Sequence, residues 1–179
     1  MTNNTYVGAV DQGTTGTRFI VFDHEGQVVA NAYEKHEQIY PEPGWVEHDP
    51  TEIWENTKDV IRRALGQAGV SPDQLEAIGV TNQRETTLLW DADSGRPVHN
   101  AIVWQDRRTT DRVEQLEEDG FVETIREKTG LEADAYFSAT KAEWLLDNAD
   151  PIKLERSRPE DIRDARRKAR SSSGPSTRG

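Results

Sequence analysis

Three short apolar segments separated by turn-forming residues open the chain, and they restrict its fold more than any other feature. Tyr6–Val10 and Thr17–Phe22 flank a polar stretch, Gln12–Gly16, and Val28–Glu37 follows after a Glu-Gly turn. Short β-branched and aromatic segments bounded by glycine and polar residues are typical of strands. The sequence therefore predicts two strands joined by a Gly/Thr-rich turn and a third strand, the antiparallel start of a sheet.

A helix is predicted to begin at the next strong signal. Asp49 is a suitable N-cap, Pro50 stands at the first helical position and Glu52 comes three residues after the cap. Apolar residues then recur at helical spacing, and Gly66 and Gly69 are expected to end the helix.

The rest of the pattern alternates strands and helices. We expect a buried strand at Leu75–Val80, further strands at Thr86–Trp90 and Ala101–Trp104, and helices at 108–129, interrupted at Gly120, and at Ala139–Asn148. This order predicts a mixed α/β domain with a mixed sheet and flanking helices, whose sheet needs more strands than this chain supplies.

Charge divides the chain into two unequal parts. Residues 1–164 hold all 33 acidic and 17 of the 22 basic side chains, a net charge of −16, whereas residues 165–179 hold five basic side chains and no acid. The strongly acidic part repels phosphate backbones and anionic lipids, so nucleic-acid and membrane partners are not expected. The tail has no apolar side chain larger than alanine or proline, so it is expected to be disordered.

Composition narrows the function classes. Apolar runs of at most four residues and the absence of a signal-peptide pattern predict a cytoplasmic protein. Without cysteine, disulfides, thiolate nucleophiles and cysteine-ligated metals are excluded, and a metal would have to be a hard ion on oxygen ligands. The acidic excess with only six lysines indicates adaptation to high salt.

The turn between the first two strands has the chemistry of a phosphate site. Glycines let backbone N–H groups face an anion, Thr14 and Thr15 add hydroxyl donors, Arg18 adds positive charge, and Asp11 can hold Mg²⁺. The alternative is an ordinary hairpin turn that uses glycine and threonine for its geometry. The spacing is neither the Walker pattern nor the dinucleotide-binding pattern, but it resembles the first phosphate loop of actin-like and sugar-kinase ATPases.

Three further segments extend this resemblance. Over residues 6–164 the chain resembles the N-terminal part of the glycerol kinases of the FGGY carbohydrate kinase family, most clearly at residues 38–50, 79–86 and 100–108. The resemblance implies a partial N-terminal domain, residues 1–164, of the ribonuclease H-like, actin-like ATPase fold. It also implies ATP and Mg²⁺ as cofactors, glycerol and ATP or ADP as partners, homo-oligomers of full-length proteins, and phosphorylation of glycerol to sn-glycerol 3-phosphate.

The resemblance also assigns residues. Arg84 and Glu85 would bind the triol, which offers only hydroxyls and therefore needs a guanidinium donor beside a carboxylate acceptor. Tyr136 would bind another hydroxyl and Trp104 would pack against the carbon chain. Without the resemblance, the Arg-Glu pair would be ordinary surface and the two aromatic residues ordinary half-buried residues.

The nucleotide side is assigned in the same way. Thr14, Thr15, Gly16 and Arg18 would contact the phosphates, with Asp11 near Mg²⁺. His48 and Asp49 are interpreted as loop and cap residues.

Two residues depart from the family pattern. Gly16 replaces the usual serine and removes one hydroxyl donor to phosphate. Ala139 replaces a glycine, which is expected to strain a turn.

The resemblance places the family's catalytic aspartate beyond the end of the chain, so no catalytic residue is predicted and the fragment is expected to be inactive. Residues 172–179 can be encoded by a nucleotide string that, two bases further on, encodes Phe-Gly-Thr-Ile-Asp-Thr-Trp, as glycerol kinases carry near this place. We therefore expect residues from about 165 to be out of frame. The alternatives are a non-catalytic polyol-binding or partner-binding fragment and another polyol or sugar kinase.

Overall fold

The computed structural model describes residues 5–149. The predicted basic tail at 165–179 and its expected change of frame lie outside these residues. None of the helices within 5–149 is both long and apolar enough to cross a membrane.

A four-stranded sheet forms the N-terminal half, in the order β3-β2-β1-β5. Its strands are β1 (Tyr6–Gln12), β2 (Gly16–Phe22), β3 (Val28–Lys35) and β5 (Leu75–Asn82). The first three strands pair antiparallel, as the sequence predicts, and β5 pairs parallel to β1. The sheet is therefore mixed, and β1 and β5 end side by side.

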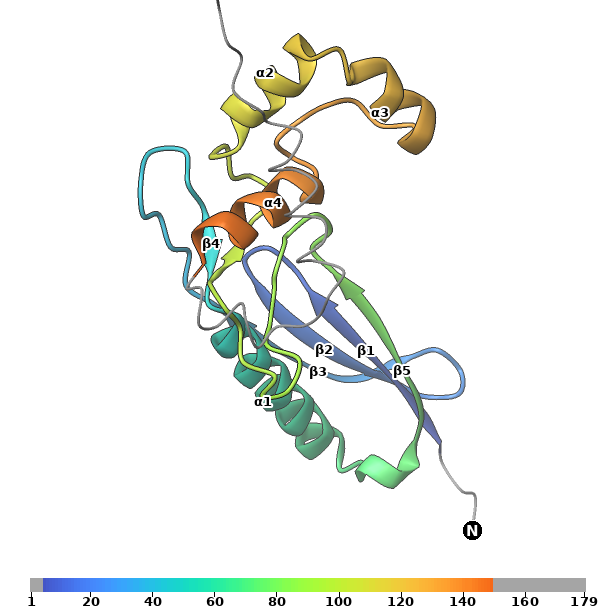
Figure 1. The fold of residues 1–179 in the computed structure, drawn as a ribbon. Coiled ribbons are helices and arrows are strands. Elements are labelled where there is room, and N and C mark those ends of the chain that lie inside the picture. The colour runs from blue at the N-terminus through green and yellow to red at the C-terminus, as the bar shows by residue number, and fades with distance from the viewer. Residues whose placement is uncertain (1–4, 150–179) are drawn as a thin grey trace, which may run out of the picture.

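Helix α1 (Pro50–Ala68) covers one face of the sheet (Figure 1). The side chain of Asp49 accepts a hydrogen bond from Thr51 N, as expected of the predicted cap. The helix runs through Gly66 and ends at Gly69, whose φ of 64° is the left-handed conformation that favours glycine. Gly66 was thus wrongly predicted to end it.

The core lies between this helix and the sheet. Alternate residues of β1, β2 and β3 point toward α1 and are buried together with one stripe of the helix: Val10, Phe19, Val21, Ala32, Val60, Ala64 and Leu65. These positions follow the strand period of two and the helical period of 3.6 residues. Packing of this layer fixes the direction of β1 and β2, and hence the place of the turn between them.

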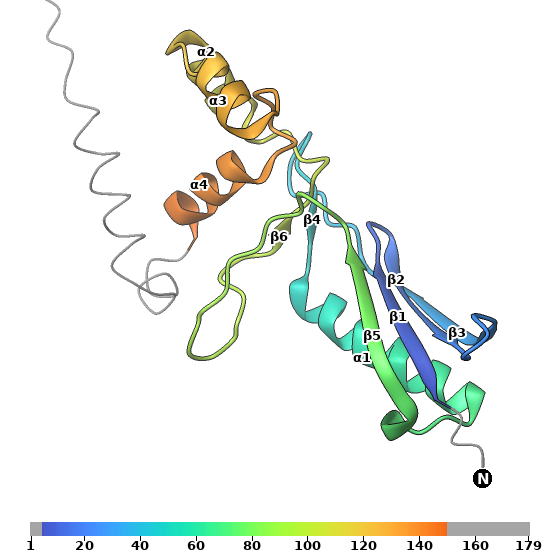
Figure 2. The same ribbon diagram turned by 90° about the vertical axis from the view of Figure 1, so that its right-hand side faces the viewer.

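A second group of short elements lies beyond the end of the sheet. They are the small sheet of β4 (Glu47–His48) and β6 (Ala101–Ile102), and the helices α2 (Thr110–Glu118), α3 (Val122–Thr129) and α4 (Ser138–Asn148). The 3-10 helix η1 (Pro72–Gln74) precedes β5. Figures 1 and 2 show α2, α3 and α4 gathered at the end of the sheet where β1 and β5 finish.

Several predictions about individual elements were wrong. Strand β5 is not buried: Ile78 is 47% and Val80 73% exposed, because α1 packs mainly against β2 and β3. Thr86–Trp90 forms no regular strand and makes only isolated bridges, one of them from Thr87 to Ile102. Ala139 lies in α4 and has no left-handed backbone, so the expected strain at this residue is absent.

Candidate functional site

The turn between β1 and β2 is a tight reversal held by a backbone hydrogen bond from Gly13 N to Gly16 O (3.0 Å). No hydrogen bond from the amide groups of Thr14 or Thr15 occurs within residues 5–149. Free amides in a glycine-containing turn form a site for an anion. This geometry fits the predicted phosphate contacts of the turn.

Thr14 is fixed in place by three side chains from distant parts of the chain. Its carbonyl oxygen lies 2.8 Å from His36 Nε2 and accepts a hydrogen bond from Gln38 Nε2 at 3.0 Å. Its hydroxyl accepts a hydrogen bond of 2.9 Å from Trp104 Nε1. Because an indole N–H can only donate, the hydroxyl proton of Thr14 remains available for another acceptor.

A buried polar network links the end of β1, next to the turn, to Gln83, His48 and Gln38. Gln83 N donates to Gln12 O at 2.7 Å, and Gln83 Nε2 lies 3.2 Å from Nδ1 of the fully buried His48, whose Nε2 lies 2.9 Å from Gln38 Oε1. Burial and the nearby His36 lower the pKa of His48 to about 4. His48 is therefore a neutral structural residue in β4, and its assignment to a loop was wrong.

Arg84 and Glu85 follow directly at the end of β5. Glu85 is the one non-glycine residue of residues 5–149 with a positive φ, 65°. Its carboxylate accepts hydrogen bonds from Ser138 N (2.9 Å) and Ser138 Oγ (2.7 Å) at the start of α4. Sparsely populated backbone conformations persist where the surroundings enforce them, and they cluster at functional sites. Arg84 is exposed, and its side chain makes no hydrogen bond within the described residues.

Two of the four predicted polyol residues, Trp104 and Tyr136, lie together at a shallow hollow, which Arg84 and Glu85 do not line. The rings of Trp104 and Tyr136 lie 5.8 Å apart in an edge-to-face arrangement. They border a hollow of about 480 Å³ together with Gln105, Arg107, Asp134 and Phe137. Glu85 lies near this hollow because its carboxylate binds Ser138, the residue after Phe137, and Thr14 lies near it because its hydroxyl binds Trp104. The structure thus brings Thr14, Glu85, Trp104 and Tyr136 to one region.

Lys141 is a further buried residue that the sequence analysis missed. Its Nζ donates to the backbone carbonyls of Tyr136 and, at 3.3 Å, of Phe137, and lies 6.0 Å from the centre of the Tyr136 ring. Burial, partly opposed by Glu85, Asp106 and Asp134, lowers the pKa of Lys141 to about 8. The lysine holds the segment that presents Tyr136.

Asp11 is the only residue proposed here for a metal, and it lies at the end of β1 opposite Arg18. Within residues 5–149 no group of three or more His, Asp or Glu could bind a metal ion. A Mg²⁺ that accompanies a nucleotide is commonly held by one or two carboxylates, phosphate oxygens and water. One exposed carboxylate beside the turn between β1 and β2 fits that mode.

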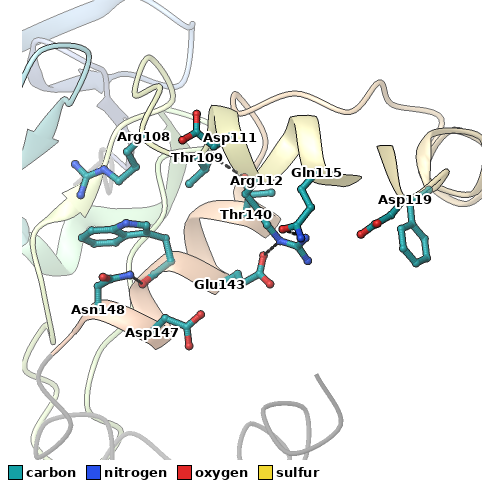
Figure 3. A pocket seen from close by; sticks show the side chains of 12 residues that line it. Arg108, Thr109, Asp111, Arg112, Gln115, Asp119, Thr140, Glu143, Asp147 and Asn148 are labelled. Atoms are coloured by element: carbon teal, nitrogen blue, oxygen red, sulfur yellow. Dashed lines mark hydrogen bonds and ion pairs between the residues drawn. The ribbon is translucent and has the colours of Figure 1, made fainter. Parts of the chain in front are cut away.

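A second, larger hollow of about 840 Å³ lies between α2 and α4 (Figure 3). An ion pair between Arg112 and Glu143 (2.8 Å) crosses it, and none of the predicted site residues lines it.

Neutral residues hidden among the recognised motifs were the main omission. Gln38 and Gln83 are uncharged amides, His36 stood outside the motifs that were assigned a role, and His48 was interpreted as a loop residue. A signal was available, since Gln38 and Gln83 belong to the segments that carry the family resemblance.

Comparisons with known proteins identify the family of this chain. The sequence profile of the FGGY family of carbohydrate kinases, N-terminal domain, matches residues 6–157. The glycerol kinase of Haloferax volcanii is 76% identical over 164 residues, which is 92% of this chain and 32% of that protein. Glycerol kinase 2 of Thermotoga maritima is 55% identical over 83% of this chain and 30% of its own length.

Solved structures show the same relationship. The crystal structure of Plasmodium falciparum glycerol kinase with ADP superposes with a TM-score of 0.77 and 34% identity, over 85% of this chain and 30% of that one. Xylulose kinase from Rhodospirillum rubrum has a TM-score of 0.74 at 27% identity, over 85% of this chain and 31% of that one. The chain spans about a third of the length of these relatives. It has the actin-like ATPase fold and belongs to the FGGY family of carbohydrate kinases, whose N-terminal domain profile it matches.

Proposed function

We propose that this chain supplies the phosphate-binding and polyol-binding half of a glycerol kinase cleft, in which ATP phosphorylates glycerol to sn-glycerol 3-phosphate. The observation that carries the proposal is the 2.9 Å hydrogen bond from Trp104 Nε1 to Thr14 Oγ1. It joins the phosphate turn directly to a residue of the polyol hollow. A transferred phosphoryl group must lie between exactly these two kinds of site, since catalysis of this transfer rests on positioning and charge stabilisation.

The residues divide the work by their chemistry. The amides of Thr14 and Thr15 and the guanidinium of Arg18 would bind the phosphates of ATP, while Asp11 would hold Mg²⁺, which neutralises charge on the phosphate oxygens. Arg84 would donate to a glycerol oxygen and Glu85 would accept from a glycerol hydroxyl.

The aromatic residues complete the polyol site. Trp104 would pack against the carbon chain of glycerol, and Tyr136 would hydrogen-bond a further hydroxyl. Because the chain spans about a third of the relatives' length, transfer is assigned to the whole protein, and the isolated chain is expected to phosphorylate no glycerol.

A chimera tests this assignment. Residues 6–157 of this chain would replace the matching part of the Haloferax volcanii enzyme, and kcat/KM would be measured for glycerol, xylulose and gluconate. We expect glycerol to be preferred and Arg84→Ala to lower kcat/KM for glycerol by about 10² or more. Arg62→Ala, an exposed arginine on α1, is the matched control and should change little. Preference for another sugar, or an unaffected Arg84→Ala chimera, would contradict the proposal.

A further inference from the structure

The backbone of Gly16 is enclosed in a way that leaves no room for a side chain. A Cβ atom at Gly16 would lie 2.3 Å from the carbonyl oxygen of Glu34 and 2.6 Å from Tyr33 Oη. Tyr33 on β3 therefore occupies the space in which any side chain of residue 16 would stand. Its phenol oxygen lies at the phosphate turn itself.

The hydroxyl of Tyr33 also contacts the turn directly. Tyr33 Oη lies 3.4 Å from Thr15 Oγ1, and either oxygen can be the donor. Each hydroxyl has one proton, and the pair uses one proton for the bond between them. In both arrangements one hydroxyl proton is left to donate to a third group. An anion bound at the turn is the acceptor that these two hydroxyls can serve.

The positive charge of the turn lies over the same ring. Arg18 pairs across the sheet with Tyr33 on one side and with Asp11 on the other, so all three side chains project from one face. The guanidinium carbon of Arg18 is 5.4 Å from the centre of the Tyr33 ring. This contact holds the cation beside the two hydroxyls, within the range of a cation–π interaction.

We infer that Tyr33 Oη is a phosphate ligand of this chain, donating to the nucleotide phosphates together with Thr15 and Arg18. The inference rests on the proposed function, because it adds one residue to the same phosphate turn. Tyr33 thereby supplies a hydroxyl donor at the turn, where Gly16 has no side chain to provide one.

Titration of the complete 179-residue chain tests the inference. Amide chemical shifts of Thr14 and Thr15 would be followed by NMR as inorganic tripolyphosphate or Mg·ATP is added. Tyr33→Phe removes only the hydroxyl and keeps the ring under Arg18. Tyr40→Phe is the matched control, since Tyr40 is 67% exposed and lies outside the turn. Circular dichroism would confirm that both variants fold as the parent does.

We expect Tyr33→Phe to weaken binding of both phosphate compounds about tenfold to a hundredfold, the usual effect of losing a hydrogen bond to a charged group. Tyr40→Phe should leave it unchanged. If the parent binds and Tyr33→Phe binds equally well, the inference is wrong and the proposed function stands. If the parent shows no shifts at Thr14 and Thr15, both the inference and nucleotide binding by this chain are refuted.

Discussion

Replacement of Arg108 by methionine is expected to be among the most destabilising single changes in the C-terminal half. The Arg108 side chain is fully buried, and Nη2 donates to Glu47 Oε1 at 2.7 Å and to Asp106 Oδ2 at 2.9 Å. Both carboxylates are at most 5% exposed. The guanidinium carbon of Arg108 lies 3.9 Å from the ring centre of Trp45 and 4.5 Å from that of Trp144, so it contacts both indoles.

The expected cost follows from what remains after the substitution. Methionine keeps much of the contact with the two rings but leaves two buried carboxylates without their cation. Breaking a buried ion pair in this way costs about 3–5 kcal/mol. The total free energy of unfolding of a domain is roughly 5–15 kcal/mol, so the loss is a large share of it.

The neighbouring arginine provides the control. Arg107 pairs with Asp134 at 2.9 Å, but its side chain is 52% exposed. Exposed pairs contribute about 0–1 kcal/mol, so Arg107→Met should be nearly neutral. Urea denaturation followed by circular dichroism measures both variants, because urea, unlike guanidinium, does not screen charge.

The reasoning would be refuted by equal losses in the two variants. A second measurement separates the ion pair from packing. Adding Glu47→Gln and Asp106→Asn to Arg108→Met removes the stranded charges and should recover part of the lost stability. If the triple variant is less stable than Arg108→Met, the buried charges are not the source of the cost.

Three further predictions concern the site. The pKa of His48 is about 4 in the folded state, against 6.5 in the unfolded chain, so only the unfolded chain gains a proton between these values. Stability should therefore fall from pH 6.5 toward pH 4. Subtracting the urea profile of His48→Gln isolates this contribution, and an unchanged slope would contradict it. The pKa of Lys141 is lowered from 10.5 to about 8, so the same effect is expected at higher pH: the parent should gain stability relative to Lys141→Met from pH 8 to pH 10.5. A constant difference would show that the buried amine is not perturbed. Gly16→Ala should lower the free energy of unfolding by about 1–3 kcal/mol through overpacking. Gly66→Ala, in a helix with open space around it, should raise the free energy of unfolding by up to about 1 kcal/mol. Thermal unfolding distinguishes the two variants, and a neutral Gly16→Ala would refute the enclosure of Gly16.

Local signals predicted the elements whose residues interact with near neighbours in sequence. The cap of α1 depends on Asp49 and Thr51, and the hairpin on strands that are adjacent in the chain. Burial of β5 could not be predicted in this way. Its apolar residues favour a covered strand, but coverage depends on which element packs there, and α1 lies over β2 and β3 instead.

The candidate site shows the same division. Charged residues in recognisable motifs, such as Arg84 and Glu85, could be proposed from sequence. The partners of Glu85 and Thr14 could not, because each contact spans a long separation: Glu85 to Ser138 is 53 residues, and Thr14 to Trp104 is 90 residues. Such pairings are set by the packing of whole elements, which leaves no local pattern to detect.

The long-range contacts also explain how a common turn sequence becomes a specific site. Gly and Thr in a hairpin would ordinarily let the turn fluctuate, but the Thr14 carbonyl is held from one side by His36 and Gln38, and its hydroxyl from the other by Trp104. Because the carbonyl and the hydroxyl of Thr14 are both fixed, its amide and its remaining hydroxyl proton are oriented before an anion binds. The conformational entropy of this residue is therefore lost during folding and not on binding. Since Trp104 also borders the hollow beside Tyr136, a molecule that shifts the indole is expected to shift the hydroxyl of Thr14 as well.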